Sequence, residues 1–501
     1  MKTNTLDFDA QALRERILDL AMRGKLVPQD PNDEPASVLL EKIKAEKAEL
    51  VKEKKIKKTK ALPAITDDEK PFDIPDSWEW VRLGDIFDIT SSKRVMKSEW
   101  KEEGIPFYRA REIVSIKNHQ KLKDPIFISK DTYEEKLKVS GRPQVDDILL
   151  TGVGTLGIPY VVSTNKDFYF KDGNIIWLRN IKKINPDFIS YYVQSPYMLK
   201  IINNGRGTTV ATLTIVRAKS LLVPLPPLSE QSRIAAKIAQ LFALLRKVEL
   251  STQQYAELQT LLKSKVLDLA MRGKLVKQDP NDEPTSVLLE KIKAEKAELI
   301  KEKKIKKSKP LPPITDEEKP FDIPDSWKWV RLGDLTAPVE YAMADGPFGS
   351  NLKKADYTLD PEVRIIQLSN IGENGWKDQN VKYTTFEHLK SIQRSEVFPG
   401  NIVIAKMMPA GRAIIVPNKD KKYVLSSDAV KFIPDTHIYK DFLIYAINSN
   451  TYRDQVNEKL QGTTRPRTSL KKLKNFLIPL PPFDEQKRIV TKTFDLFNMI
   501  G

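Results

Sequence analysis

Glycines at three positions carry the spacing of a dinucleotide-binding fingerprint, Gly152-x-Gly154-x-x-Gly157. Such glycines hold a nucleotide phosphate where a strand leads into the N-terminus of a helix. Here the strand-like run 148–150 is followed by 158–162, which continues as a second strand. The glycines therefore predict the turn of a β-hairpin and not a cofactor site.

Other residue types that could carry chemistry are scattered. His119, His388 and His437 do not have metal-ligand spacing, so the sequence predicts no metal site. Asp146-Asp147 adjoins a strand and shapes a turn. Asn185-Pro186-Asp187-Phe188 is similar in part to the Asn-Pro-Pro-Tyr/Phe loop of amino-methyltransferases but lacks the second proline. We therefore expect no catalytic residues in this chain.

The composition indicates the cellular compartment and the net charge of the chain. The chain of 501 residues has no cysteine, which favours a reducing compartment. Its start lacks the apolar core of a signal peptide and no run is long enough to span a bilayer, so we expect a cytoplasmic protein. The net charge is +16, but residues 41–60 and 290–309 each hold nine Lys and four Glu. Charge alone leaves nucleic-acid binding and simple solubility both open.

The chain contains a long internal repeat. Residues 18–58 and 267–307 differ only at Pro28/Lys277, Ala36/Thr285 and Val51/Ile300. The match continues, less strictly, to Leu83-Gly84-Asp85 and Leu332-Gly333-Asp334. Beyond that point the two halves diverge, and they converge again at Pro224–Pro227 and Pro479–Pro482. A duplicated surface offers one kind of partner the same site twice, whereas two unlike domains recognise two different things.

A long helix is expected over residues 229–273. Its apolar residues, from Ile234 to Leu269, recur at the 3.5-residue period of a coiled-coil seam. Residues 484–501 match the start of this helix and residues 7–27 match its end. The two termini thus make most of a second copy, which predicts antiparallel packing of both copies and a pseudo-twofold molecule with a cyclic arrangement of its termini.

The expected fold class is α+β, with two globular domains separated by long helices packed as an antiparallel coiled coil. Charged helices are predicted at 36–59 and 285–308, and Trp78, Trp80, Trp327 and Trp329 are expected to anchor the first strand of each domain. The predicted segments are 1–28 (part of the distal helical region), 29–75 (charged helix and linker), 76–228 (first domain), 229–276 (central helix), 277–324 (charged helix and linker), 325–483 (second domain) and 484–501 (rest of the distal helix).

This organisation resembles the specificity subunit of Type I restriction–modification enzymes, over essentially the whole chain. The most specific marks are the run from Pro224 to Gln231 with Arg233-Ile234, and its partner that ends at Arg488-Ile489. Ala21–Val27 with its repeat and the run 345–353 also resemble this family.

The resemblance implies a DNA-binding subunit without catalysis of its own. Each domain would be a target-recognition domain that reads one half of a two-part sequence in double-stranded DNA, and the paired helices would fix the gap between the halves. Two modification (methyltransferase) subunits would dock on the repeated helical surfaces with S-adenosylmethionine. Restriction/translocase subunits would supply ATP- and Mg-dependent translocation and cleavage. The chain itself would bind no cofactor and no membrane.

Within the recognition domains, Arg, Lys, Asn, Gln, Ser and Thr on strand ends and loops are the expected contacts, because these side chains reach base edges or phosphates. The candidate DNA-binding residues are Ser92, Lys93, Arg94, Tyr108, Arg109, Arg111, Arg206, Thr208, Thr209, Ser350, Asn351, Lys353, Lys354, Gln367, Ser369, Asn370, Arg412, Thr463, Thr464, Arg465 and Arg467. The candidate partner-binding residues are Arg233, Lys237, Arg488 and Lys492.

Two other functions remain open at this point. A coiled-coil adaptor would use the globular domains to bind protein, and salt-sensitive binding to duplex DNA would exclude it. A self-contained DNA methyltransferase or nuclease would need the cofactor motifs that the sequence does not show.

Overall fold

The computed structural model describes residues 9–181, 184–204, 212–307, 309–348, 351–462 and 464–501. The chain divides into a first unit, Asn4–Thr252, and a second unit that contains Gln253–Gly501. The boundary lies inside one continuous helix, α9 (Leu228–Met271), which agrees with the helix expected over 229–273. Each unit is α+β and carries its own apolar core.

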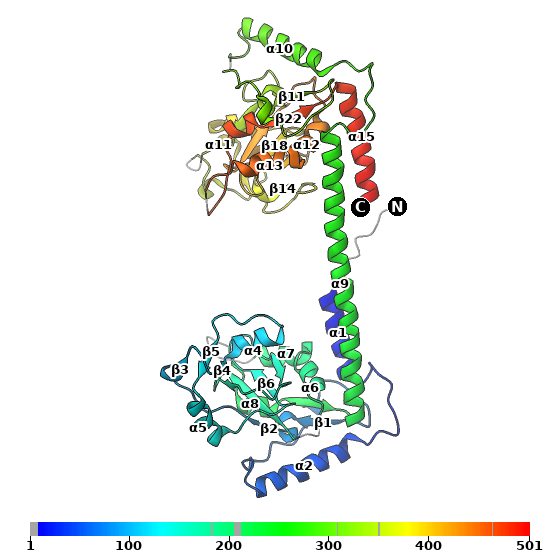
Figure 1. The fold of residues 1–501 in the computed structure, drawn as a ribbon, viewed down its shortest axis with the longest axis vertical. Coiled ribbons are helices and arrows are strands. Elements are labelled where there is room, and N and C mark those ends of the chain that lie inside the picture. Colours follow the sequence, from blue (N-terminus) through cyan, green and yellow to red (C-terminus); the bar gives the residue numbers. More distant parts are fainter. Residues whose placement is uncertain (1–8, 182–183, 205–211, 308, 349–350, 463) are drawn as a thin grey trace. The chain divides into compact units, whose positions relative to one another are not determined.

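The first unit is built on short strands in three sheets (Figure 1). Strand β1 (Glu79–Arg82) pairs antiparallel with β10 (Leu222–Leu225). One four-stranded sheet has the order β2 (Phe87–Thr90), β9 (Ile175–Asn180), β6 (Ile148–Thr151), β7 (Pro159–Val161). The other has the order β3 (Trp100–Lys101), β5 (Ile126–Ile128), β4 (Ile105–Tyr108), β8 (Tyr169–Phe170). Antiparallel pairing of β6 with β7 confirms the hairpin expected at the glycine-rich turn.

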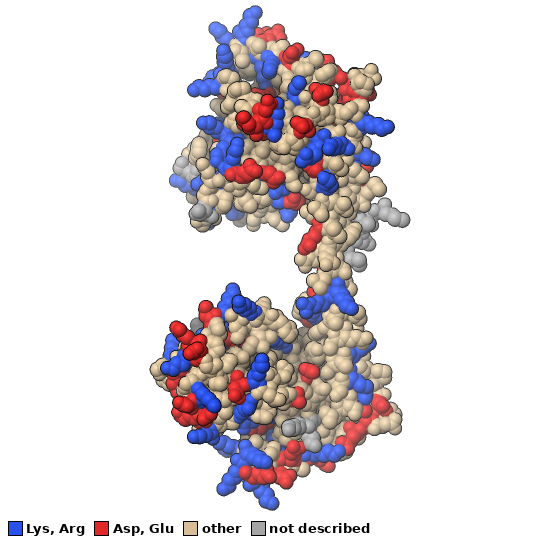
Figure 2. Space-filling model, viewed as in Figure 1, with Lys and Arg blue, Asp and Glu red and all other residues tan. Residues whose placement is uncertain are grey.

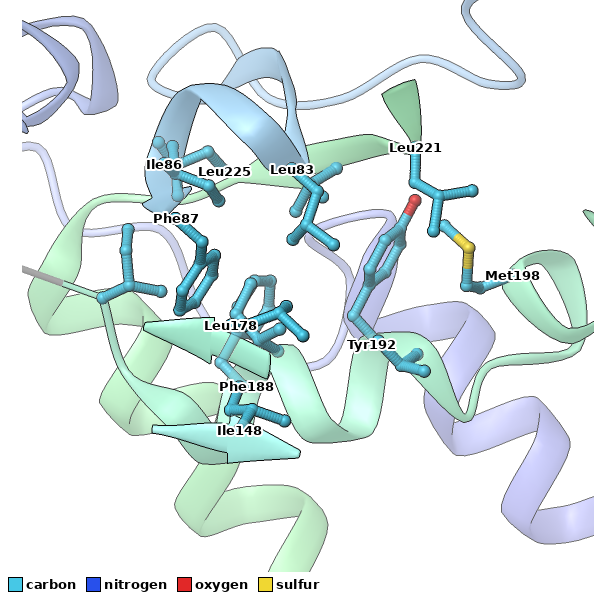
Figure 3. Packing of buried hydrophobic residues seen from close by; sticks show 14 of the residues in the cluster. Leu83, Ile86, Phe87, Ile148, Leu178, Phe188, Tyr192, Met198, Leu221 and Leu225 are labelled. Carbon is cyan, nitrogen blue, oxygen red and sulfur yellow. The ribbon is translucent and has the colours of Figure 1, made fainter. Parts of the chain in front are cut away.

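Helices cover these sheets and close the core. They are α3 (Leu83–Ile86), α4 (Ala110–Lys117), α5 (Lys130–Ser140), α6 (Pro186–Val193), α7 (Pro196–Asn203) and α8 (Ile215–Ser220). Figure 3 shows Leu83 and Ile86 of α3 facing Phe188 and Tyr192 of α6 across the end of the sheet. The buried Tyr192 hydroxyl donates to the carbonyl of Leu222, so this polar group is satisfied inside the core.

The second unit repeats this plan with different strands. Strand β11 (Lys328–Arg331) pairs with β22 (Leu477–Leu480). One four-stranded sheet has the order β12 (Met343–Asp345), β21 (Ala429–Phe432), β18 (Ile402–Ala405), β19 (Ala413–Ile415). The other has the order β16 (Tyr383–Thr384), β13 (Val363–Ile366), β20 (Tyr423–Leu425), β17 (Glu396–Val397). A small pair, β14 (Ile371–Gly372) and β15 (Gly375–Trp376), and helices α11 (Phe386–Ser391), α12 (Lys440–Asn448), α13 (Asn450–Glu458) and α14 (Leu470–Asn475) complete it.

The predicted role of the four tryptophans is confirmed. Trp78 and Trp327 precede β1 and β11 and are buried. Trp80 and Trp329 lie within these strands, half-buried, and their rings pack 5.1 Å from Phe72 and Phe321. All four rings therefore anchor the first strand of each unit to the segment that precedes it.

Each end of α9 has an antiparallel helix beside it. In the first unit, Arg14 of α1 (Ala10–Met22) donates to Glu249, whereas Gln29, farther along the chain, donates to Glu230. In the second unit, Gln259 donates to the carbonyl of Ile500 at the end of α15 (Phe483–Ile500). This direction is the one that the seam predicted.

The buried part of the seam is shorter than expected. Ile234 and Ile238 are fully buried, but Val248, Tyr255 and Leu262 are about half exposed. Among the described residues, the apolar stripe of α9 is therefore buried near its start and partly exposed around Tyr255.

The charged helices are shorter than the predicted 36–59 and 285–308. They are α2 (Ala36–Lys52) and α10 (Thr285–Lys301). Lys54 and Lys303 adopt left-handed φ angles of 59° and 58°. The N–H of Lys55 then donates to the carbonyl of Leu50, the bond that ends a helix in a Schellman turn. The pattern of lysines in the sequence does not predict these helix ends.

Within the described residues, no helix combines the length and the apolar composition that crossing a membrane requires.

Candidate nucleic-acid interface

Equivalent turns follow an internal strand in the two units. In the first unit β4 ends at Tyr108, and the backbone N–H of Arg109 donates to Oε2 of Glu112 at 2.9 Å. In the second unit β13 ends at Ile366, and the N–H of Gln367 donates to Oδ1 of Asn370 at 2.8 Å. Both strands lie inside their sheets, beside a parallel neighbour. The two units thus present different side chains from one common backbone turn.

In the first unit the turn holds a cluster of two arginines around one buried carboxylate. Oε1 of Glu112 accepts from Nη2 of Arg109 and from Nε of Arg111, both at 2.6 Å, and Oε2 accepts from Nε of Arg109 at 3.0 Å. Glu112 is 2% exposed, whereas the Arg111 side chain is 56% exposed. Burial would raise the pKa of Glu112, but the hydrogen bonds from both arginines hold it below its ordinary value. Glu112 thereby fixes the two guanidinium groups.

Glu112 was not among the predicted residues. Glu112 is the third residue of the helix that starts after Arg109, and an acidic residue at this position indicates only a helix cap. Its second role, holding two arginines at once, depends on burial of the carboxylate.

In the second unit, the prediction that Asn370 contacts DNA needs correction. Asn370 is fully buried, and its amide donates to the carbonyls of Lys377 and Gln379 at 2.9 and 2.7 Å. Its side chain is used inside the loop that it supports. Gln367 is half-buried and Ser369 has a buried hydroxyl without a partner in the described part of the chain. Gln367 is therefore the partly exposed candidate at this turn, and its amide nitrogen donates to the carbonyl of Asn380 at 3.1 Å.

Two further candidates of the first unit also have structural roles. The Ser92 hydroxyl donates to the carbonyl of Phe170 at 2.6 Å. The Tyr108 ring stacks on Phe168, with centroids 5.3 Å apart, and burial raises its pKa. Lys93 and Arg94 beside them are exposed. The loop after β2 therefore offers these two cations, with Ser92 as its anchor.

The remaining candidates of the second unit lie on loops. Arg412 forms an ion pair with Glu373, and its side chain is 19% exposed. Gln461 and Arg467 exchange two backbone hydrogen bonds, at 3.0 and 2.9 Å. The exposed candidates in this unit are Asn351, Lys353, Lys354, Thr464, Arg465 and Arg467. The candidates Arg206, Thr208, Thr209, Ser350 and Thr463 lie outside the described residues.

The candidate partner-binding arginines have partners within the chain. Arg233 donates to both carboxylate oxygens of Asp33, at 3.2 and 2.6 Å, and Arg488 does the same to Asp282, at 3.1 and 2.5 Å. Both pairs hold the loop before a charged helix against a long helix. Lys237 and Lys492 are exposed. The arginines therefore fix the repeated segments to the helices α9 and α15, and Lys237 and Lys492 are exposed cations on these helices.

A buried joint is duplicated in the two units. Glu230 accepts from Nε1 of Trp78 at 2.9 Å and from Gln29 at 2.6 Å. Glu485 accepts from Trp327 and Gln278 at the same two distances. Burial raises the pKa of both carboxyl groups, although the hydrogen bonds from tryptophan and glutamine oppose this effect. In each unit, the same Glu–Trp–Gln contact, named here the Glu–Trp–Gln joint, therefore connects three segments. They are the helix that carries the glutamate (α9 or α15), the repeated segment and the start of the first strand.

The surface in Figure 2 shows basic and acidic side chains interspersed over both units on the visible face. On this face, therefore, neither unit shows a single patch of one charge.

Comparisons with known proteins agree with the duplicated plan. The family model described as Type I restriction modification DNA specificity domain matches residues 75–260 and 324–500. The specificity subunit of the Type I restriction enzyme EcoAI of Escherichia coli is 32% identical over 98% of this chain and 89% of its own length. That of EcoEI, also of Escherichia coli, is 28% identical over 98% of this chain and 90% of its own length.

A solved structure shows the same fold. It is described as the structural basis underlying complex assembly and conformational transition of the type I R-M system. The similarity covers 86% of this chain and 92% of that chain, with a TM-score of 0.55 and 19% sequence identity.

Proposed function

The chain belongs to the family of Type I restriction–modification specificity subunits, and we propose that each of its two units reads one half of a two-part DNA target. As a member of this family the chain recognises target DNA and assembles with modification and restriction subunits, which carry out the catalysis. The recognition domains in this proposal are residues 76–228 and 325–483.

One observation carries the proposal. The turn after β4 and the turn after β13 have the same backbone bond at their start, yet one displays Arg109 and Arg111 and the other Gln367. Arginine pairs best with guanine and glutamine with adenine in the major groove. Different side chains on a common turn are what two readers of different base sequences require.

The repeated segments support two copies of one partner. Residues 18–58 and 267–307 are nearly identical, and each is fixed by the same Glu–Trp–Gln joint. We assign one modification subunit to each repeated surface, with Lys237 and Lys492 as exposed contacts. S-adenosylmethionine would bind in the modification subunits, and ATP and Mg in the restriction subunits.

Selection of DNA from a random duplex pool tests this function. The chain and its modification subunit are purified together, and the bound sequences are read. We expect two separate blocks of fixed bases with a gap of constant length between them. A single continuous block, or binding without sequence preference, would contradict the assignment of two readers.

A further inference from the structure

Three side chains that could bind a metal ion meet beside α10 in the second unit. Glu295 lies on α10, and Asp435 and His437 lie on the segment between β21 and α12. Their ligand atoms all lie within 4.8 Å of one another. Nδ1 of His437 is 2.8 Å from Oδ1 of Asp435 and 3.7 Å from Oε2 of Glu295.

These distances suit one tetrahedral cation. Zinc binds nitrogen and oxygen ligands at about 2.0–2.1 Å, which places two ligand atoms roughly 3.3 Å apart. The two measured separations lie on either side of this value. An imidazole beside two carboxylates favours zinc over magnesium and calcium, which prefer ligand sets made of oxygen alone.

The buried carboxylate gives an independent reason to expect a cation. The Asp435 side chain is fully buried, and its Oδ2 has no hydrogen-bond partner among the described residues. A buried carboxylate oxygen left unpaired is strongly unfavourable. The ammonium group of Lys296, next to Glu295, is close enough to interact with the charge of Asp435, but it donates to the carbonyl of Asp334 at 2.8 Å and Oδ2 of Asp435 keeps no hydrogen bond among the described residues.

The first unit provides a natural comparison. Glu46 of α2 occupies the position of Glu295 in the repeat. The backbone N–H groups of Asn185 and Tyr439 make the same bond, to Gln231 and Gln486, and therefore align the two segments. Four residues earlier the first unit has the buried Ile181 where the second has Asp435. The complete ligand set is particular to the second unit.

We propose that Glu295, Asp435 and His437 form a zinc site that fastens α10 to the second unit. The metal takes the place of the hydrogen bond between Nδ1 of His437 and Oδ1 of Asp435 and brings Glu295 onto the same centre. The sequence predicts no metal site, because spacing along the chain does not show that Glu295 lies beside residues 435–437.

Zinc titration of the full chain tests the proposal. The tag-free protein is freed of metal with a chelator and titrated with zinc chloride by calorimetry, and its thermal unfolding is followed with and without zinc. We expect one zinc ion per chain and a higher unfolding temperature with zinc. Magnesium chloride at the same concentrations should neither bind nor compete.

The variants identify the ligands. Glu295→Gln and His437→Ala should weaken zinc binding by roughly tenfold or more, since even indirect support of a metal ligand is commonly worth ~10–100-fold. Glu46→Gln, the same change in the same local sequence of the first unit, should bind zinc like the original chain. Glu295 is 43% exposed, so its substitution leaves the core intact, which circular dichroism checks. Absence of zinc binding, or equal binding by all variants, would overturn the proposal.

Discussion

Arg111→Ala is expected to relax recognition of one half of the DNA target and to leave the other half unchanged. The Arg111 side chain is 56% exposed. Its Nε donates to Glu112, and its Nη2 makes long bonds of 3.4 and 3.3 Å to the carbonyls of Lys123 and Asp124, which DNA can replace. A bidentate contact between arginine and a base is worth about 1–3 kcal/mol of discrimination. Binding of the complex to duplexes that carry single base changes measures this loss.

Gln367→Ala is the matched control, because it removes a partly exposed side chain at the equivalent turn of the second unit. It should relax only the other half of the target. Glu112→Gln should act like Arg111→Ala at the same half-site, since it weakens the hold on both arginines without removing them. A loss spread equally over both halves in any of these variants would contradict one reader per half.

Insertion of seven residues into the middle of α9 is expected to lengthen the gap between the two halves and to leave the bases in each half unchanged. Seven helical residues add about 10.5 Å, which corresponds to roughly three base pairs at 3.4 Å each. The insertion belongs beside Tyr255, where α9 is exposed and the described packing of α1 and α15 is not disturbed. Binding selection on the variant reads the new gap.

The original target should bind the lengthened variant several kcal/mol more weakly, because each mismatched base pair costs about 1–3 kcal/mol and one half-site is out of register. An insertion of seven residues in the loop beside Leu359, which is 96% exposed and not a candidate for DNA contact, is the control, and it should not change the gap. An unchanged gap in the α9 variant would refute the role of this helix as a spacer.

The long-range plan of the fold could be predicted because it depends on periodicity and repetition. The 3.5-residue period placed the central helix at 229–273, and the structure has it at Leu228–Met271. The repetition also placed Trp78 and Trp327 at equivalent positions before the first strand of each unit, where both are buried. Apolar spacing and duplicated sequence are local signals that survive without knowledge of tertiary contacts.

The candidate site could be predicted only in part, because contact with DNA and burial within the loop call for the same polar residue types. Asn370 and Ser92 have the right chemistry for DNA, yet their side chains are bonded inside the chain. Glu112 has the wrong charge to contact DNA, so the sequence does not predict it as a site residue, although it holds Arg109 and Arg111. Tertiary packing decides which polar side chains face inward, and the spacing of residues along the chain does not predict it.

Copying the first recognition domain into the second position tests the account most directly. Residues 325–483 are replaced by residues 76–228, with junctions at the Phe-Asp-Ile-Pro-Asp-Ser-Trp joint and at Pro-Leu-Pro-Pro, which are identical in the two halves. The variant is expressed with its modification subunit, and methylated adenines are mapped across the genome. We expect a target that contains the same half-sequence twice. A target that still contains two different halves would contradict the assignment of one half to each unit.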